Sequence, residues 1–408
     1  MRTAFGTFCL AAALVCPVFA VNADELTCGV VSTHGQAFGL QANWYGRTKE
    51  ELRRLVDRHR GEKDAYAVFD CDNTTTIGDI SQAYQANMLE DLHFAFGPKR
   101  MAEIFAKDIP DVNRPLISGN PNSTAANLTA DLADAYRELL ELKKAGGDYR
   151  ASPVFEEFAA KYHVLFVGII RTFGAGFACQ WIGYAFTGYT HEEIAAYERV
   201  VVKRELVRGR LYQQSYTVPA AQARRAGVCT GSVSRGLAFP AENIALFRAL
   251  REAGIVPHIV SASSQELLLA VFTDPAFGYG FSPDCLFGYT LQKDAAGKVL
   301  PVSAPDDWRP RDEGKVELIR KILMPRFGGR EPVLVGGDST GDVPMLTAFK
   351  GMERGLIYNH RPLKDDSLGA LVREALSFAD SRYLLQGRDN STVSFVPRPT
   401  SVTVSACE

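Results

Sequence analysis

The sequence lacks a strong net charge of either sign. Its 408 residues include 45 lysines and arginines and 47 aspartates and glutamates, which gives a formal net charge of −2. Proteins that hold nucleic acid through phosphate contacts depend on an excess of positive charge. The charge balance therefore gives no electrostatic argument for nucleic acid as a partner, and we expect a small substrate.

Long hydrophobic runs are also scarce. The apolar run at residues 4–19 covers about 16 positions, whereas a helix that spans a membrane needs ~20. The run follows Arg2 and leads into small residues that suit cleavage, so it predicts a signal peptide over residues 1–23, with Ala20 as an alternative cleavage point. We therefore expect a periplasmic or secreted protein that is not held in a membrane after cleavage.

Two common cofactor motifs begin in the sequence but are not completed. His191 opens the string HEEIA, in which position 195 is alanine where a helical zinc motif needs a second histidine. Gly174 and Gly176 begin a glycine pattern whose third position is Cys179, so the dinucleotide fingerprint is incomplete as well. Neither string predicts a cofactor site of its own.

Cysteine is sparse enough to be considered residue by residue. Outside the expected signal peptide the cysteines are Cys28, Cys71, Cys179, Cys229, Cys285 and Cys407. Six cysteines in an oxidising compartment allow 15 complete pairings, and the sequence does not choose among them. A Cys28–Cys407 bond would tie the two ends together, and a Cys179–Cys229 bond would close part of the middle segment. Cys71 follows an apolar run and packs like a small hydrophobe, so we expect it to be a free thiol.

Short apolar strands alternate with helices on both sides of a long middle segment. A helix is expected at 47–58 and a strand at 65–70. Later in the sequence, helices are expected at 241–253, 265–272, 315–323, 343–349 and 366–378, and strands at 255–261, 332–337 and 355–358. This alternation predicts an α/β fold with a doubly wound parallel sheet.

The middle segment, residues 80–237, follows a different pattern. It is mostly helical in character, rich in alanine, glutamate and aromatic residues, and in the size range of an independent domain. We therefore expect a helical domain at 80–237 inserted into a core made of 24–79 and 238–380, with a C-terminal extension at 381–408. No internal repeat or low-complexity tract interrupts this arrangement.

The strongest chemical signal is the string AVFDCDNT at 67–74, where two carboxylates leave the end of an apolar strand. Asp70 is placed to attack phosphorus and form an acyl phosphate. Asp72 is placed to protonate the leaving alkoxide and then to activate water. A solvent-exposed turn after a strand would give the same pair of residues, so the string alone does not decide the function.

Three further elements follow in order. Ser261 ends a predicted strand, where its hydroxyl and the backbone N–H of Ala262 could hold a phosphoryl oxygen. Lys315 opens a helix and offers a fixed positive charge. Asp338 and Asp342 follow another strand and offer the hard oxygen ligands that magnesium prefers. Each residue could also be a helix cap or a surface side chain, but the four elements together indicate a catalytic site.

These elements resemble the four motifs of haloacid dehalogenase superfamily phosphatases. The matching residues are Asp70, Asp72, Thr74, Ser261, Lys315, Asp338 and Asp342. The resemblance implies a Rossmann-like core with a mobile cap, and Mg²⁺ bound by Asp70, the backbone carbonyl of Asp72 and Asp338, with Asp342 supporting. An acid at position 72 favours phosphate-ester hydrolysis over dehalogenation, and Thr74, Ser261, Ala262 and Lys315 are the implied phosphate ligands.

A closer similarity links YAVFDCDNT, EGKVELI and YLLQGRDNST to exported bacterial phosphatases of the phosphorylcholine phosphatase group. It implies phosphocholine or a related small phosphomonoester as substrate. The aromatic stretch at 165–189 could then bind a trimethylammonium group through Trp181, Tyr184 and Phe177. The alternative is that these aromatic residues form the core of the helical segment. The competing functions are phosphoryl transfer between metabolites and ligand binding without turnover, both on the same scaffold.

Overall fold

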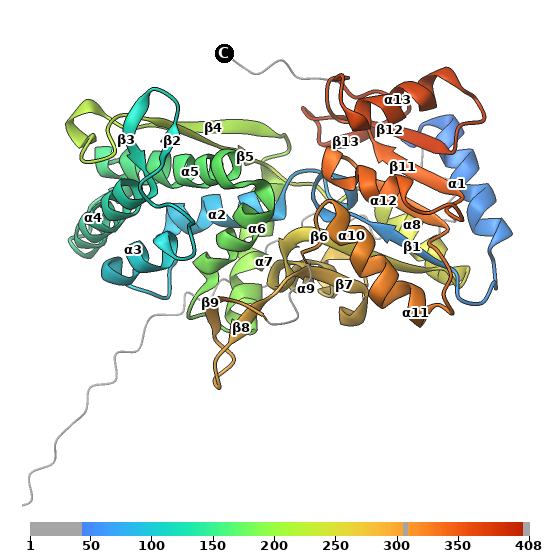
Figure 1. Ribbon diagram of the computed structural model, residues 1–408, viewed down its shortest axis with the longest axis horizontal. Helices are drawn as coiled ribbons and strands as arrows, with labels where there is room; N and C mark the ends of the chain where they lie inside the picture. The colour runs from blue at the N-terminus through green and yellow to red at the C-terminus, as the bar shows by residue number, and fades with distance from the viewer. Residues whose placement is uncertain (1–42, 305–308, 403–408) are drawn as a thin grey trace, which may run out of the picture. The chain divides into compact units, whose positions relative to one another are not determined.

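The computed structural model describes residues 43–304 and 309–402 (Figure 1). The expected signal peptide and two of the cysteines, Cys28 and Cys407, lie outside these residues. Within the described residues, no helix combines the length and apolar character that crossing a membrane requires.

A seven-stranded sheet forms the core, in the order β13-β12-β11-β10-β1-β6-β7. Its strands are β1 (Tyr66–Phe69), β6 (Val256–Ser264), β7 (Leu286–Tyr289), β10 (Leu334–Gly337), β11 (Arg354–Tyr358), β12 (Tyr383–Asp389) and β13 (Ser394–Val396). All neighbouring strands run parallel except β12 and β13 at one edge. The expected α/β fold with a mostly parallel central sheet is confirmed.

The strand order places a switch point beside β1. From β1 the chain builds one side of the sheet through β6 and β7, and it then crosses over to build the other side through β10, β11 and β12. In sheets of this kind, ligands bind beyond the carboxyl ends of the strands where the direction of winding reverses. A ligand site is therefore expected next to the carboxyl ends of β1 and β10.

Helices cover both faces of the sheet. They are α1 (Gly46–Arg58), α8 (Ala241–Glu252), α9 (Gln265–Phe272), α10 (Glu313–Leu318), α11 (Met324–Arg326), α12 (Val343–Thr347) and α13 (Ser367–Ser377). Because side chains alternate along a strand, Ala67 and Phe69 of β1 pack in the cluster that contains α1, α8 and α9. Tyr66 and Val68 pack in the cluster with α10, α12 and α13.

Residues 80–237 are mostly helical, as expected. Their helices are α2 (Ile80–Asp91), α3 (Pro98–Ala106), α4 (Ala125–Lys144), α5 (Pro153–Phe173), α6 (Ala175–Trp181) and α7 (His191–Val207). Two hairpins, β2–β3 (Pro115–Ile117 and Asn120–Thr124) and β4–β5 (Tyr212–Thr217 and Thr230–Arg235), form separate two-stranded sheets. A third hairpin, β8–β9 (Leu291–Lys293 and Val299–Ser303), lies in the core half of the sequence.

The C-terminal residues differ from the expectation. Residues 381–408 were expected to form an extension, but Tyr383–Asp389 form β12, which pairs in parallel with β11. Leu384 and Leu385 are buried on opposite faces of the sheet, one in each hydrophobic cluster. A strand with apolar residues on both faces belongs inside a sheet covered on both sides, so this segment is part of the core.

The cysteines also correct one expectation. Cys71, Cys179, Cys229 and Cys285 are all free. The suggested Cys179–Cys229 bond is therefore wrong: Cys179 lies on α6, whereas Cys229 lies in the connection of the β4–β5 hairpin. The expected free thiol at Cys71 is confirmed, and its side chain is fully buried.

The two connections between the core and residues 80–237 lie side by side. Ile77 and Ala238 form an antiparallel bridge with two backbone hydrogen bonds of 2.9 Å. Gly78 and Gly236 flank this bridge with φ angles of 94° and 95°. A β-carbon on Gly78 would lie 2.5 Å from the carbonyl oxygen of Gly236. Both the backbone conformation and the close approach therefore require glycine here.

Gly78→Ala should lower the free energy of unfolding by about 2–3 kcal/mol, because it combines backbone strain with a clash. Gly119→Ala is the matched control: Gly119 has a φ of 80°, but a β-carbon there would meet nothing within 4 Å. That control should cost only about 1 kcal/mol. Chemical denaturation measures both. Equal losses would contradict the close packing of the two connections.

Candidate active site

Asp70 is held where β1 ends. Its backbone N–H donates to the carbonyl of Gly336 in β10 at 3.0 Å, and its own carbonyl accepts from the hydroxyl of Thr75 at 2.6 Å. The chain then turns through Asn73, whose φ of 59° is tolerated by asparagine better than by most residues. Arg388 of β12 donates to the Asn73 side-chain oxygen at 2.9 Å. The turn that carries the catalytic candidates is thus anchored to three strands.

Lys315 joins two carboxylates behind this turn. Its Nζ lies 2.7 Å from Oδ1 of Asp70 and 2.6 Å from Oδ1 of Asp342, and its side chain is only 3% exposed. Burial alone would lower the pKa of Lys315, but the charges of Asp342 and Asp70 raise it above the ordinary value. The lysine therefore stays protonated and fixes the positions of both carboxylates.

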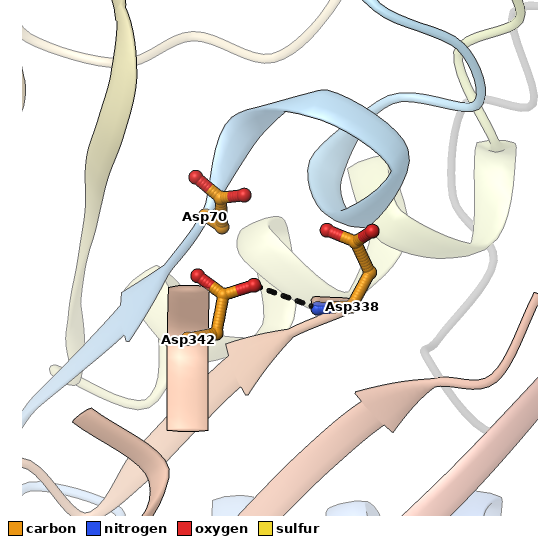
Figure 2. Close-up of side chains that lie close together, drawn as sticks. All are labelled: Asp70, Asp338 and Asp342. Carbon is orange, nitrogen blue, oxygen red and sulfur yellow. Dashed lines mark hydrogen bonds between the residues drawn. The ribbon is translucent and has the colours of Figure 1, made fainter. Parts of the chain in front are cut away.

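Asp338 and Asp342 come from the turn after β10. Oδ2 of Asp342 accepts from the backbone N–H groups of Asp338 and Ser339, each at 3.0 Å, and from the Ser339 hydroxyl at 2.9 Å. Oδ1 of Asp338 accepts from the hydroxyl of Thr74 at 3.0 Å, and its Oδ2 lies 2.7 Å from Nε2 of His360. Figure 2 shows Asp338 and Asp342 beside Asp70, with the bond from the Asp338 N–H drawn as a dashed line.

The three carboxylates form a cluster that could hold a divalent cation. One oxygen from each of Asp70, Asp338 and Asp342 lies within 4.8 Å of the others, and all three residues are buried. Burial raises the pKa of Asp70 to about 7, although Lys315 opposes the shift. Burial and the charge of Asp342 raise the pKa of Asp338 to about 6. Such shifts mark negative charge that the protein compensates only in part, which a hard divalent cation would offset.

The members of this cluster are not equivalent. Asp342 has four close partners: Lys315 at Oδ1 and three donors of the turn at Oδ2. Each oxygen of Asp338 has one partner within 3.0 Å, Thr74 or His360. Asp70 and Asp338 line the cavity described below, whereas Asp342 does not. The geometry therefore suits Asp70 and Asp338 as direct metal ligands and Asp342 as their support.

Asp72 lies apart from the carboxylate cluster. Its Oδ1 accepts from the backbone N–H of Ile80 at 2.8 Å, and its Oδ2 accepts from the hydroxyl of Ser263. Burial raises the pKa of Asp72 well above its ordinary value, and the charge of Asp79 adds to the shift. A raised pKa favours the protonated form of the carboxyl, which is the form that a general acid needs.

A cavity of about 180 Å³ opens over these residues. It brings together the predicted residues Asp70, Asp72, Ser261, Ala262 and Asp338. Lys315 and Thr74 were also predicted to bind phosphate, but they do not line the cavity: Lys315 holds Asp70, and Thr74 donates to Asp338. The lining residues that the sequence did not single out are Asn73, Asp79, Ser81, Gln82, Phe166, Cys179, Ile182, Ser263, Arg311, Ser339 and Arg361.

The predicted aromatic residues lie elsewhere. The Trp181 side chain is 0% exposed, its Nε1 donates to the carbonyl of Phe105 at 3.0 Å, and its ring packs on Phe105. The hydroxyl of Tyr184 donates to Asp108 at 2.7 Å. Phe177 packs against the hydrophobic core. None of the three predicted residues lines the cavity, so the alternative of a helical-segment core describes their positions.

Comparison with known proteins finds a similar sequence. No family model matches the chain. The phosphorylcholine phosphatase of Pseudomonas aeruginosa is 23% identical over 337 residues, which cover 78% of this chain and 80% of that protein.

Two solved structures are also similar. A functionally unknown protein from Anaerococcus prevotii has a TM-score of 0.77 and 24% identity, covering 90% of this chain and 99% of the other, and this likeness supports the fold. A protein of unknown function from Bordetella pertussis has a TM-score of 0.38 and 16% identity over 77% of this chain and 96% of the other.

The position of Trp181 leads to a prediction about stability. Trp181→Ala should lower the free energy of unfolding by about 3–5 kcal/mol, because it leaves a large cavity in a packed core. Any activity that remains should change equally for every substrate. Phe166→Ala is the comparison, since Phe166 lines the active-site cavity and is only half-buried. Thermal melting and KM values for several phosphate esters measure both. A change of substrate ranking in Trp181→Ala at an unchanged melting temperature would contradict the core assignment.

Proposed function

We propose that this protein is a magnesium-dependent phosphomonoester hydrolase of the haloacid dehalogenase type, which forms an aspartyl-phosphate intermediate. The observation that carries the proposal is the constellation at the switch point of the sheet: a buried carboxylate, Asp70, fixed by Lys315 and facing a cavity that also contains Asp72. The name of the Pseudomonas aeruginosa relative supports a phosphatase.

The proposed reaction has two steps. In the first, a carboxylate oxygen of Asp70 attacks phosphorus, the bond to the leaving oxygen breaks, and Asp72 gives its proton to the departing alkoxide. In the second, the Asp72 carboxylate takes a proton from water while the water oxygen attacks the phosphorus. The acyl phosphate then breaks, and it releases phosphate and the Asp70 carboxylate. Asp72 ends the cycle protonated, as it began.

The surrounding residues hold these two groups in place. Lys315 orients Asp70 and supplies a positive charge behind it, and Ser263 orients the carboxyl of Asp72. Ser261 and the backbone of Ala262 line the cavity, where they can receive phosphoryl oxygens. Asp70, Asp338 and the backbone carbonyl of Asp72 would hold Mg²⁺, which would offset the negative charge of the phosphoryl group.

Residues 80–237 take the role of a cap in this proposal. Phe166, Cys179 and Ile182 of this segment line the same cavity as the core carboxylates. A cover over the site excludes water and orders the substrate. Because the first 23 residues predict export, the proposed place of action is the periplasm or the medium.

Phosphocholine is a substrate to test rather than one that the cavity favours. A trimethylammonium group is held by several aromatic faces, and Phe166 is the single aromatic residue among the described residues that line the cavity. The proposal therefore extends to small phosphomonoesters as a class.

Asp70→Asn should reduce turnover by at least on the order of 10⁴-fold, because the amide keeps the shape of the side chain but cannot act as a nucleophile. Asp365→Asn is the control, since this carboxylate is fully exposed and does not line the cavity. Phosphate release from p-nitrophenyl phosphate measures the effect, and rapid quenching followed by mass spectrometry should find a phosphoryl group on Asp70 of the unsubstituted enzyme. Near-normal turnover in Asp70→Asn would overturn the mechanism.

Removal of divalent metal by a chelator should abolish turnover, and Mg²⁺ should restore it. Mg²⁺ should also raise the melting temperature, and more so at pH 8 than at pH 5. The reason is that Asp70 and Asp338 have raised pKa values of about 7 and about 6, and a metal ligand must be deprotonated. Asp338→Asn should weaken the effect on melting. Equal stabilisation of that variant, or stabilisation that falls as pH rises, would show that Mg²⁺ binds elsewhere.

A further inference from the structure

Two arginines line the cavity without a role in the proposed chemistry. Arg311 lies in the loop before α10, and Arg361 lies in the loop after β11. Their side chains are 32% and 47% exposed. Both loops belong to the core half of the molecule, so the two positive charges sit on the same side of the site as the carboxylates.

Each guanidinium is paired with one carboxylate at the long end of ion-pair distance. Among the described residues, the carboxylates within 4.0 Å are Asp312, 3.3 Å from Arg311, and Asp338, 3.5 Å from Arg361. Nε of Arg361 also lies 3.4 Å from Nε2 of His360, and Arg311 interacts with the thiol of Cys179. A guanidinium has five N–H donors in a planar fork that matches a carboxylate or phosphate. Most of these donors are therefore available to a ligand.

Two of the four acidic residues that line the cavity, Asp72 and Asp79, accept hydrogen bonds from the protein. Asp79 accepts from the backbone N–H of Gln82 at 2.9 Å and from its side-chain amide at 2.8 Å. Asp72 is engaged by Ser263 and by the N–H of Ile80. Because these two carboxyl groups already accept hydrogen bonds within the protein, they would bind a cationic ligand less strongly than two unpaired carboxylates would.

The loop of Arg311 is tightly built. A β-carbon on Gly314 would lie 1.8 Å from the carbonyl oxygen of Arg309, and Asp312 has φ 51° and ψ −128°, an unfavourable conformation for a residue with a side chain. The Cζ of Arg311 lies 3.9 Å from the place of a β-carbon on Gly341. Arg311 is thus held beside the turn after β10, which also carries Asp338.

The transferred phosphoryl group already has its partners in the proposed function, namely Ser261, the backbone of Ala262 and the metal. We propose that Arg311 and Arg361 bind a second anionic group, on the leaving part of the substrate. The substrate class is then a small phosphomonoester that carries a carboxylate or a second phosphate. This inference rests on the proposed phosphatase function, and it assigns the choice of substrate to two loops of the core.

A matched series of two-carbon phosphate esters tests it with the full-length mature protein and Mg²⁺. Phosphoglycolate carries a carboxylate, ethylene glycol bisphosphate a second phosphate, 2-hydroxyethyl phosphate a neutral hydroxyl and phosphocholine a cation. We expect kcat/KM to be at least about tenfold higher for one of the two anionic esters than for the neutral one. The two anionic members distinguish a carboxylate from a phosphate.

Arg311→Gln and Arg361→Gln should each remove most of this preference. The loss should be at least about tenfold in kcat/KM for the preferred anionic ester, chiefly through KM, and less than about threefold for 2-hydroxyethyl phosphate. Arg309→Gln is the control, because Arg309 is exposed in the same loop and does not line the cavity. Thermal melting of each variant checks that the fold is intact.

The outcomes separate this inference from the proposed function. An equal loss for all four esters would place the arginines on the transferred phosphoryl group and overturn the inference. Preference for phosphocholine, or no preference, would overturn it as well while leaving the phosphatase in place. Failure of every ester and of p-nitrophenyl phosphate with Mg²⁺ present would instead overturn the proposed function, and this inference with it.

Discussion

The ammonium group of Lys315 is the contact on which the site depends. It lies between Asp70 and Asp342, with both distances under 3 Å, and joins the end of β1 to the turn after β10. Without this cation, three buried carboxylates would face one another in a medium that solvates charge poorly, and removal of one partner from a buried ionic group costs several kcal/mol. The lysine thus permits the chain to keep three carboxylates in one crevice, where Asp70 is the proposed nucleophile and Asp70 and Asp338 are the proposed metal ligands.

The core of this site could be predicted from the sequence because parallel strands deliver their carboxyl ends to one edge. Asp70, Ser261 and Asp338 each follow a short apolar run. Their positions after these runs are therefore enough to predict that they lie at the same edge of the sheet. Ser263 was missed, although it stands two residues after Ser261 and the strand continues to Ser264. Arg311 and Arg361 gave no signal, because a loop arginine beside a cavity has the same sequence context as one in solvent.

The aromatic stretch at 165–189 is a case in which the sequence could not decide between two structures. A cage for a cation and the core of a helical segment use the same residues at the same spacing, and the choice depends on contacts from distant parts of the sequence. Trp181 is buried against Phe105 of α3, 76 positions away. β12 was missed for a related reason: its apolar run becomes a strand only because β11 already offers it an edge to pair with.

Residues 80–237 and the strands and loops of the sheet line one cavity but contribute different groups to it. Residues 80–237 supply Phe166, Cys179 and Ile182, which exclude water but carry no charge at neutral pH, and the polar side chains Ser81 and Gln82. The charged groups come from the strand ends and loops of the core, apart from Asp79, which lies in the connection to the segment. The distribution of charge in a cleft determines which ligands it attracts. An apolar cover strengthens the electrostatic interactions with the ligand because it excludes water. The two connections meet at Gly78 and Gly236, so residues 80–237 join the core at one place. Under the proposed roles, the loops that carry Arg311 and Arg361 would select the substrate, and residues 80–237 would strengthen that selection because they exclude water.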